Sequence, residues 1–158
     1  MEDLLFSGVV GMIAWILAFG HDLSRLRLPK EATQTLLRFL FVISIYIVGF
    51  TLLKATGLRV MPAAVVALTV VGIGLAIVRL DLFWYALRGA VLFAIVYFVF
   101  LRVSFWIWPH WIDEWNLEAL WDLFILGVPA EEIVWAFFYG GVSPLATGYI
   151  LKVIPPRQ

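Results

Sequence analysis

Residues 82–108 read LFWYALRGAVLFAIVYFVFLRVSFWIW, a nearly unbroken apolar run in which only Arg88 and Arg102 carry a charge. A transmembrane helix needs about 20 mainly apolar residues to cross the hydrocarbon core of a bilayer. This run exceeds that length, so it predicts a membrane-spanning helix that can tilt. The same criterion divides the rest of the chain.

Four further apolar stretches cover residues 4–20, 36–55, 60–78 and 130–151. Each has roughly the 17–25 residues of a bilayer-spanning helix. The polar segment 21–31 follows the first stretch, and Arg79-Leu80-Asp81 predicts a tight turn before residue 82. Met1-Glu2-Asp3 lacks the positive charges of a signal peptide, so we expect the first stretch to be retained. The chain is therefore expected to be all-α, with about five transmembrane helices.

The composition agrees with this fold class. Of the 158 residues, 64% are hydrophobic and 14% are charged, whereas soluble domains average about 45–50% and about 25%. Residues 1–158 fit a single transmembrane helical domain. The net charge is zero, so nothing indicates a nucleic-acid partner. The chain has no Cys, which excludes disulfides and thiolate chemistry.

Residues 117–126 differ from the other apolar stretches because they are too few to span a bilayer. We expect a half-helix or interfacial helix there, ended by Gly127-Val128-Pro129. Pro129 is expected to be the first residue of the last span, where its missing N–H costs nothing. Pro144 lies inside that span and should kink it by freeing the carbonyl of Gly140.

The distribution of Lys and Arg predicts the orientation, because cytoplasmic loops are enriched in these residues. With five spans and the N-terminus outside, eight of the eleven basic residues fall on the cytoplasmic side: Arg25, Arg27, Lys30, Arg38, Arg79, Arg88, Lys152 and Arg157. Lys54, Arg59 and Arg102 fall on the other side. We expect a multi-pass protein of the plasma or inner membrane with a cytoplasmic C-terminus.

Six of the eleven acidic residues and five of the eight Trp lie between residues 106 and 132. The Trp residues of this region, including Trp121, are typical of an interfacial aromatic belt, and the alternative is a binding site. Asp113, Glu114 and Glu118 are typical of a solvated face. Asp122 either continues that face or lies opposite Glu131 and Glu132.

Glu131 and Glu132 stand in the first turn of the last span, directly before Ile-Val-Trp-Ala-Phe-Phe-Tyr. Helical spacing places Trp135, Phe138 and Tyr139 on the face of Glu131, and Ala136 and Tyr139 on the face of Glu132. A carboxyl among aromatic residues at a membrane is a candidate functional site. Burial would keep it protonated, as a proton donor requires. The alternative is a pair of ionised carboxylates that stabilise the helix N-terminus.

Several enzyme classes lack their motifs here. Gly-x-Ser-x-Gly and His-Glu-x-x-His are absent, as are the Walker A and dinucleotide-binding fingerprints. The intramembrane CAAX-processing proteases also pair two Glu residues, but they expect an Arg where this chain has Ala136, and they use helix histidines that it lacks. His21 and His110 show no metal-ligand spacing, so we expect neither a metal nor a cofactor.

The segment 125–138, ILGVPAEEIVWAFF, resembles the signature of the lycopene cyclase domain. This integral-membrane type occurs in heterodimeric bacterial and archaeal carotenoid cyclases and in fungal fusions. Pro129, Glu131 and Glu132 match its Pro-x-Glu-Glu motif, which precedes an aromatic-rich span. Family domains typically carry three helices, and a complete cyclase brings two such domains. This chain has one motif, which implies half of a heterodimer with a second cyclase-domain subunit, a homodimer, or a relative with a different role.

The resemblance implies a redox-neutral, acid-catalysed ring closure at the end of an apolar polyene drawn from the membrane lipid. A carboxylic acid kept protonated by an apolar site would start the reaction, and aromatic faces would stabilise the carbocation. The implied catalytic residues are Glu131 as the acid and Glu132 as its partner. The implied substrate-binding residues are Trp121, Trp135, Phe138 and Tyr139, and Pro129, Asp122 and Arg102 would support them.

A different class of function remains open, that of a non-enzymatic subunit or scaffold of a membrane complex. Small residues four apart, as in Ala63 and Ala67 or Gly72 and Ala76, would let helices pack closely. A proton-coupled transporter is less well supported, because such proteins distribute charged groups over several helices and often contain an inverted repeat.

Overall fold

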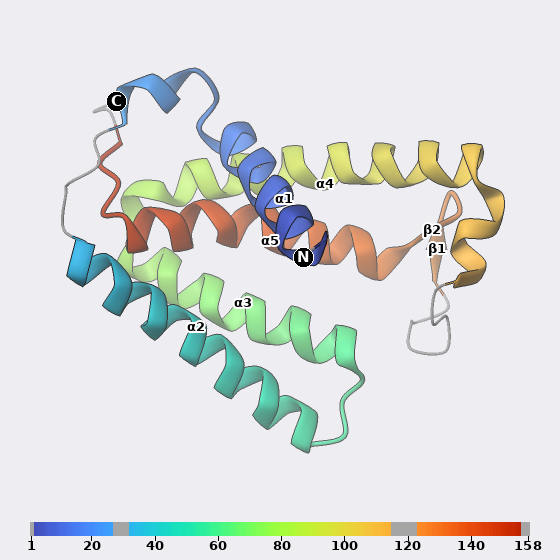
Figure 1. Cartoon of the computed structure of the whole chain (residues 1–158), viewed down its shortest axis with the longest axis horizontal. Helices are drawn as coiled ribbons and strands as arrows, with labels where there is room; N and C mark the ends of the chain where they lie inside the picture. Colours follow the sequence, from blue (N-terminus) through green and yellow to red (C-terminus); the bar gives the residue numbers. More distant parts are fainter. Residues whose placement is uncertain (1, 27–31, 115–122, 156–158) are drawn as a thin grey trace.

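The computed structural model of the chain describes residues 2–26, 32–114 and 123–155 (Figure 1). Five α-helices make up most of this part: α1 (Glu2–Phe19), α2 (Ala32–Ala55), α3 (Val60–Val78), α4 (Phe83–Ile107) and α5 (Ala130–Ile150). Short 3₁₀ segments follow α1 (Gly20–Arg25), precede α4 (Leu80–Leu82) and follow it (Pro109–Glu114). A two-stranded hairpin, β1 (Phe124–Ile125) and β2 (Val128–Pro129), leads into α5.

Four of these helices are long and apolar enough to cross a membrane. They cover Thr33–Ala55, Val60–Val78, Leu80–Ile107 and Ala130–Ile150. The first helix differs, because its described apolar part, Val9–Phe19, is shorter. The all-α class and four of the five expected spans are thereby confirmed by length and composition, and the architecture is that of a multi-pass membrane protein.

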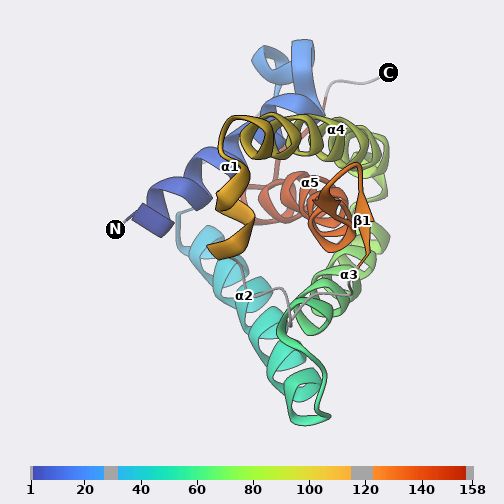
Figure 2. The same ribbon diagram turned by 90° about the vertical axis from the view of Figure 1, so that its right-hand side faces the viewer.

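Helix α5 lies at the centre of the bundle and contacts the other four helices (Figure 2). Its small residues explain this position. Ala136, Gly140, Pro144 and Gly148 are spaced four apart and all are buried. Residues with this spacing form one ridge along a helix, and small side chains there let neighbouring backbones approach closely.

Helices α4 and α5 approach each other closely at Gly89 and Gly140. A Cβ atom on Gly140 would lie 2.6 Å from the Cβ of Phe93, and one on Gly89 would lie 2.6 Å from the carbonyl oxygen of Gly140. Pro144 cannot donate a hydrogen bond to that carbonyl, which instead lies against α4. Helix α5 runs through Pro144 as one element, and the expected kink stays a prediction.

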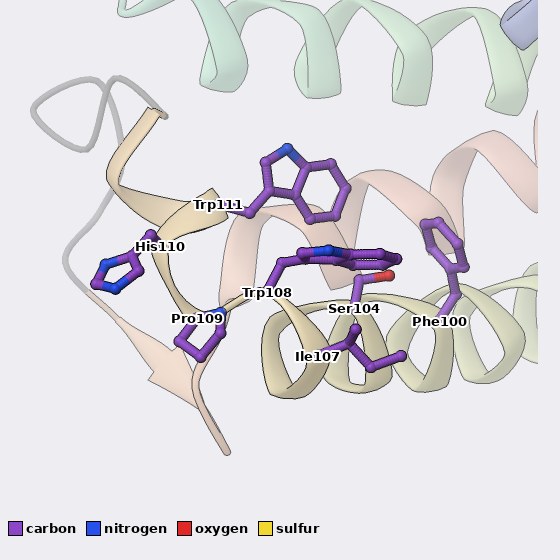
Figure 3. A pocket seen from close by; sticks show the side chains of 7 residues that line it. All are labelled: Phe100, Ser104, Ile107, Trp108, Pro109, His110 and Trp111. Carbon is purple, nitrogen blue, oxygen red and sulfur yellow. The ribbon is translucent and has the colours of Figure 1, made fainter.

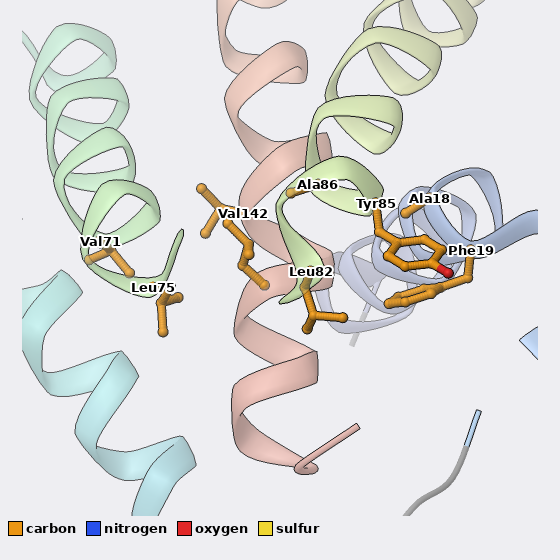
Figure 4. Packing of buried hydrophobic residues seen from close by; sticks show 9 residues of the cluster. Ala18, Phe19, Val71, Leu75, Leu82, Tyr85, Ala86 and Val142 are labelled. Carbon is orange, nitrogen blue, oxygen red and sulfur yellow. The ribbon is translucent and has the colours of Figure 1, made fainter. Parts of the chain in front are cut away.

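Helix α3 packs against the other side of α5. A Cβ on Gly72 would lie 2.6 Å from Cγ2 of Val142, so this contact also depends on a missing side chain. Four helices meet in the adjacent core (Figure 4). Its buried members are Ala18 and Phe19 of α1, Val71 and Leu75 of α3, Leu82, Tyr85 and Ala86 around the start of α4, and Val142 and Leu145 of α5.

Arg79 ties the turn between α3 and α4 to the end of α5. Its guanidinium donates to both carboxylate oxygens of Asp81, at 2.8 and 2.7 Å, and to the carbonyl oxygens of Gly148 and Val153. The carbonyls at a helix C-terminus lack partners within the helix, and a cation there satisfies them. The tight turn expected at residues 79–81 is confirmed.

The half-helix expected over residues 117–126 is wrong at its described end. Ile125 pairs with Val128 and Phe124 with Pro129 in an antiparallel hairpin. Leu126 and Gly127 form the loop with φ of 51° and 83°, as a two-residue hairpin turn requires. Pro129 consequently ends β2 and precedes α5 instead of being its first residue. Residues 117–122 lie outside the described part of the chain.

Candidate functional site

The hairpin fixes where α5 begins. Val128 is fully buried against Leu101 and Phe105 of α4, and the N–H of Ala130 donates to the carbonyl of Leu123 at 2.8 Å. Since β2 is held against α4, the first turn of α5 starts inside the bundle. The Glu131 side chain of that turn therefore enters the protein interior, and Glu132 does so only in part.

Glu131 is 1% exposed. It is the most deeply buried acidic side chain among those whose exposure the structure describes. Both side chains lie in the first turn of α5, so stabilisation of the helix N-terminus by ionised carboxylates stays the alternative interpretation. Glu132 is only partly buried, so the two adjacent carboxyls have different surroundings.

Glu132 is held by Tyr97 of α4. The Tyr97 hydroxyl donates a hydrogen bond of 2.9 Å to Oε2 of Glu132. Sequence reasoning missed Tyr97, which lies in the middle of the apolar run 82–108. The aromatic residues of that run give no local signal, and only the pairing of α4 with α5 brings this one to the carboxyl.

Tyr97 belongs to a group of four contacting aromatic rings that we call the ring cluster: Phe93, Tyr97, Trp135 and Tyr139. Trp135 stacks on Tyr139 with centroids 4.9 Å apart, and Phe93 stacks on Tyr97 at 5.8 Å. Tyr97 also contacts Trp135 at 5.5 Å, and Phe93 contacts Tyr139 at 5.7 Å. The cluster thus joins α4 and α5 beside Glu132.

Helix α1 packs over the ring cluster and contacts both α4 and α5. Val10 and Ala14 are buried against it. A Cβ on Gly11 would lie 3.3 Å from the Tyr139 hydroxyl, so the glycine leaves space for that group. The wall over the cluster therefore comes from the first helix of the chain.

The structure brings together only some of the residues expected at the site. Trp135 and Tyr139 lie with Glu132, whereas Phe138 faces away. Its ring contacts Phe137 at 5.6 Å. Both rings line a separate cavity of about 180 Å³ between α3, α4 and α5.

The residues expected to support the site differ in where they lie. Pro129 is buried and directs the chain into α5. Arg102 is exposed, and no acid in the described ranges forms an ion pair with it. Trp121 and Asp122 lie outside the described residues.

A larger cavity, about 640 Å³, lies at the end of α4 (Figure 3). It is lined by Phe100, Ser104, Ile107, Trp108, Pro109, His110 and Trp111. The Phe100 ring is 6.4 Å from that of Tyr97, so one aromatic ring separates this cavity from the ring cluster. Its walls are mostly apolar and suit an apolar ligand.

A further cavity of about 240 Å³ lies between α2, α3 and α5. Tyr139 contributes to its wall, together with Tyr46, Val71 and Ser143 among others. Tyr139 therefore belongs both to the ring cluster and to the wall of this cavity. Apolar space borders the cluster on more than one side.

Metal ligands are not grouped in the described ranges, where no three His, Asp or Glu side chains come together. His110 and Asp113 form an exposed pair at 3.3 Å.

A family model for lycopene cyclase matches residues 60–150 of the chain. The chain belongs to the lycopene cyclase family. The matched region is more than half of the chain, beginning at the first residue of α3 and ending at the last of α5. No curated protein and no solved structure matches the chain.

The lycopene cyclase match contains Glu131, Glu132 and Tyr97, and it spans three helices. That is the helix number expected of one family domain, and the resemblance seen in residues 125–138 extends over a much longer region. Helices α1 and α2 lie outside the match.

Proposed function

We propose that the chain is a carotenoid cyclase-like membrane protein that closes a ring at the end of a polyene by acid catalysis. The observation that carries this proposal is the Glu131–Glu132 pair. It lies inside the region matched by the lycopene cyclase family, with one carboxyl buried and the other bonded to Tyr97 beside four aromatic rings.

The chemistry requires one proton donor and one acceptor. A carboxylic acid adds a proton to a terminal double bond, the cation closes a ring by attack of a second double bond, and loss of a neighbouring proton gives the product. No electrons are gained or lost. Glu131 would donate the proton, and Glu132 would act as its partner. The enclosed position of Glu131 would let it meet an apolar substrate away from water.

The ring cluster would face the cationic intermediate. Aromatic faces attract cations through their quadrupoles, and they do so without supplying a nucleophile that would trap the carbocation. Trp135 and Tyr139 are the two members of the ring cluster on the same helix as the carboxyl pair, and they stack on each other. The bordering apolar cavities would accommodate part of the remaining polyene, which reaches the protein from the membrane lipid.

We further infer that α1 is the fifth span, with the N-terminus outside and the C-terminus in the cytoplasm. The Lys and Arg distribution supports this orientation. One three-helix match with one Glu-Glu motif supports a requirement for a second cyclase-domain subunit or a second copy of this chain.

Expression in a host that accumulates lycopene tests the activity. The chain is expressed alone and together with the product of any neighbouring family gene, and the pigments are separated by chromatography. We expect a cyclised carotenoid from at least one of the two expressions. Unchanged lycopene in both expressions would refute the proposal. Glu131→Gln should lower the rate by about 100-fold or more, as expected for a general acid. Asp113→Asn, which neutralises an exposed carboxylate, is the control and should leave the rate unchanged.

A non-enzymatic membrane subunit is the second candidate, and α2 favours it. This helix lies outside the family match, and no residue in its apolar window is buried. Purification in mild detergent separates the two functions. A stoichiometric protein partner without bound pigment would favour the scaffold, and a coloured preparation absorbing like a carotenoid would favour the cyclase.

A further inference from the structure

The two adjacent carboxyls of the site are held in different ways. Glu131 is enclosed by protein on nearly all sides and is 1% exposed. Glu132 is only partly buried, so enclosure restricts its side chain less. Glu132 is instead connected to another helix, α4, by the 2.9 Å hydrogen bond that the Tyr97 hydroxyl donates to it.

Tyr97 is itself fixed by its neighbours. Its ring stacks on Phe93 with an interplanar angle of 16° and also contacts Phe100 and Trp135. A side chain packed on three rings has little rotational freedom, so the position of its hydroxyl is defined by the α4–α5 contact. Such packing is what allows one group to hold another in a reactive geometry.

We propose that Tyr97 is the positioning residue of the carboxyl pair, fixing the Glu132 side chain through Oε2 so that Glu132 exchanges protons through Oε1. The role in ring closure rests on the proposed function. The reaction adds one proton to the polyene and removes one. The Glu131–Glu132 pair therefore carries the same number of protons before and after a turnover, and Tyr97 neither gains nor loses one.

Tyr97→Phe is the decisive variant because it removes the hydroxyl and keeps the ring. Its matched control is Tyr85→Phe. Tyr85 lies on the same helix, is buried and stacks on Phe19, and its hydroxyl donates to Oδ2 of Asp22 at 3.3 Å. Both variants lose one hydroxyl that bonds a carboxylate, but only Tyr97 bonds a carboxyl of the site.

We expect Tyr97→Phe to lower kcat for cyclisation by about 10- to 100-fold, the usual effect of losing one hydrogen bond to a carboxylate. Tyr85→Phe should leave kcat within about twofold of the unmodified protein, as expected away from the site. In a Glu132→Gln background, Tyr97→Phe should cause no further loss, since its effect acts through Glu132. An unchanged kcat in Tyr97→Phe, or an equal loss in both backgrounds, would overturn the inference.

Infrared spectroscopy tests the same contact without any activity. The carboxyl stretching band removed by Glu132→Gln should shift in Tyr97→Phe and stay in place in Tyr85→Phe. If the unmodified protein forms no cyclised product with any partner, the proposed function fails, and a shifted band still supports the positioning of Glu132. A band that does not shift refutes it whether or not the protein is active.

Discussion

The crossing of α4 and α5 predicts a large effect from one added methyl group. In Gly140→Ala, the new Cβ would lie 2.6 Å from the Phe93 Cβ, 2.7 Å from the Gly89 carbonyl oxygen and 3.2 Å from the Ala90 Cα. Carbon atoms in contact normally lie about 3.5–4.0 Å apart, so the overlap is roughly 1 Å. Two of the three obstructing atoms belong to the backbone, and a side-chain rotation cannot relieve the clash.

The helices must therefore separate, and overpacking of this kind costs about 1–3 kcal/mol. That lowers the folded-to-unfolded ratio roughly 5- to 150-fold. The matched control is Gly74→Ala on α3, where nothing lies within 4 Å of the added Cβ. This control should be neutral or slightly stabilising, because Ala favours a helix over Gly by up to about 1 kcal/mol.

Thermal unfolding of both variants in the same detergent, followed by circular dichroism, measures the difference. The separation should also lengthen the Tyr97–Glu132 hydrogen bond, because both residues lie on the helices that move apart. The infrared band of Glu132 should then shift in Gly140→Ala and not in Gly74→Ala. Equal midpoints for the two variants would refute the packing of α4 against α5 described above.

Substitutions at three other positions test separate features. Arg79→Lys should lower the free energy of unfolding by about 1–2 kcal/mol, because a lysine cannot reach Asp81 and the carbonyls of Gly148 and Val153 together. A thermal midpoint equal to that of the unmodified protein would contradict this role of Arg79. Leu126→Asn should raise the free energy of unfolding by about 1 kcal/mol, since Asn tolerates the positive φ at this position. Leu126→Val should lower the free energy of unfolding. A lower thermal midpoint for Leu126→Asn than for Leu126→Val would contradict the hairpin turn. Trp135→Leu should slow cyclisation about tenfold through loss of a cation-stabilising ring, and Trp135→Phe should slow it less; equal rates for the two would argue against that role.

The spans could be predicted because the thickness of the bilayer fixes their length and hydrophobicity. Residues 60–78 were predicted as a span, and α3 has those bounds. The sequence does not predict the hairpin before α5, because the two residues of its loop are Leu126 and Gly127. A leucine at positive φ carries none of the Asn or Asp signal that marks such turns. An apolar stretch of that length reads equally well as a short helix.

The carboxyl pair could be found because Pro129, Glu131 and Glu132 form a compact motif on one segment. The rest of the site depends on which helices meet, and periodicity along one helix does not supply that information. Phe138 shares a helical face with Glu131 and is therefore expected at the site. The ring that contacts the carboxyl pair is instead Tyr97, which belongs to α4, bonds Glu132 and packs on Trp135. The ring cluster thus became visible only after α4 and α5 were placed together.

The wall that α1 places over the ring cluster has a consequence for biosynthesis. Val10 and Ala14 are synthesised first, yet they pack on Phe93 and Ala136, which lie about 80 and 120 residues further along the chain. Contacts so distant in sequence close late in folding. Until α4 and α5 have been made, the side of α1 that carries Val10 and Ala14 lacks these partners. The interior around Glu132 is completed only when α5 packs against α4 and α1.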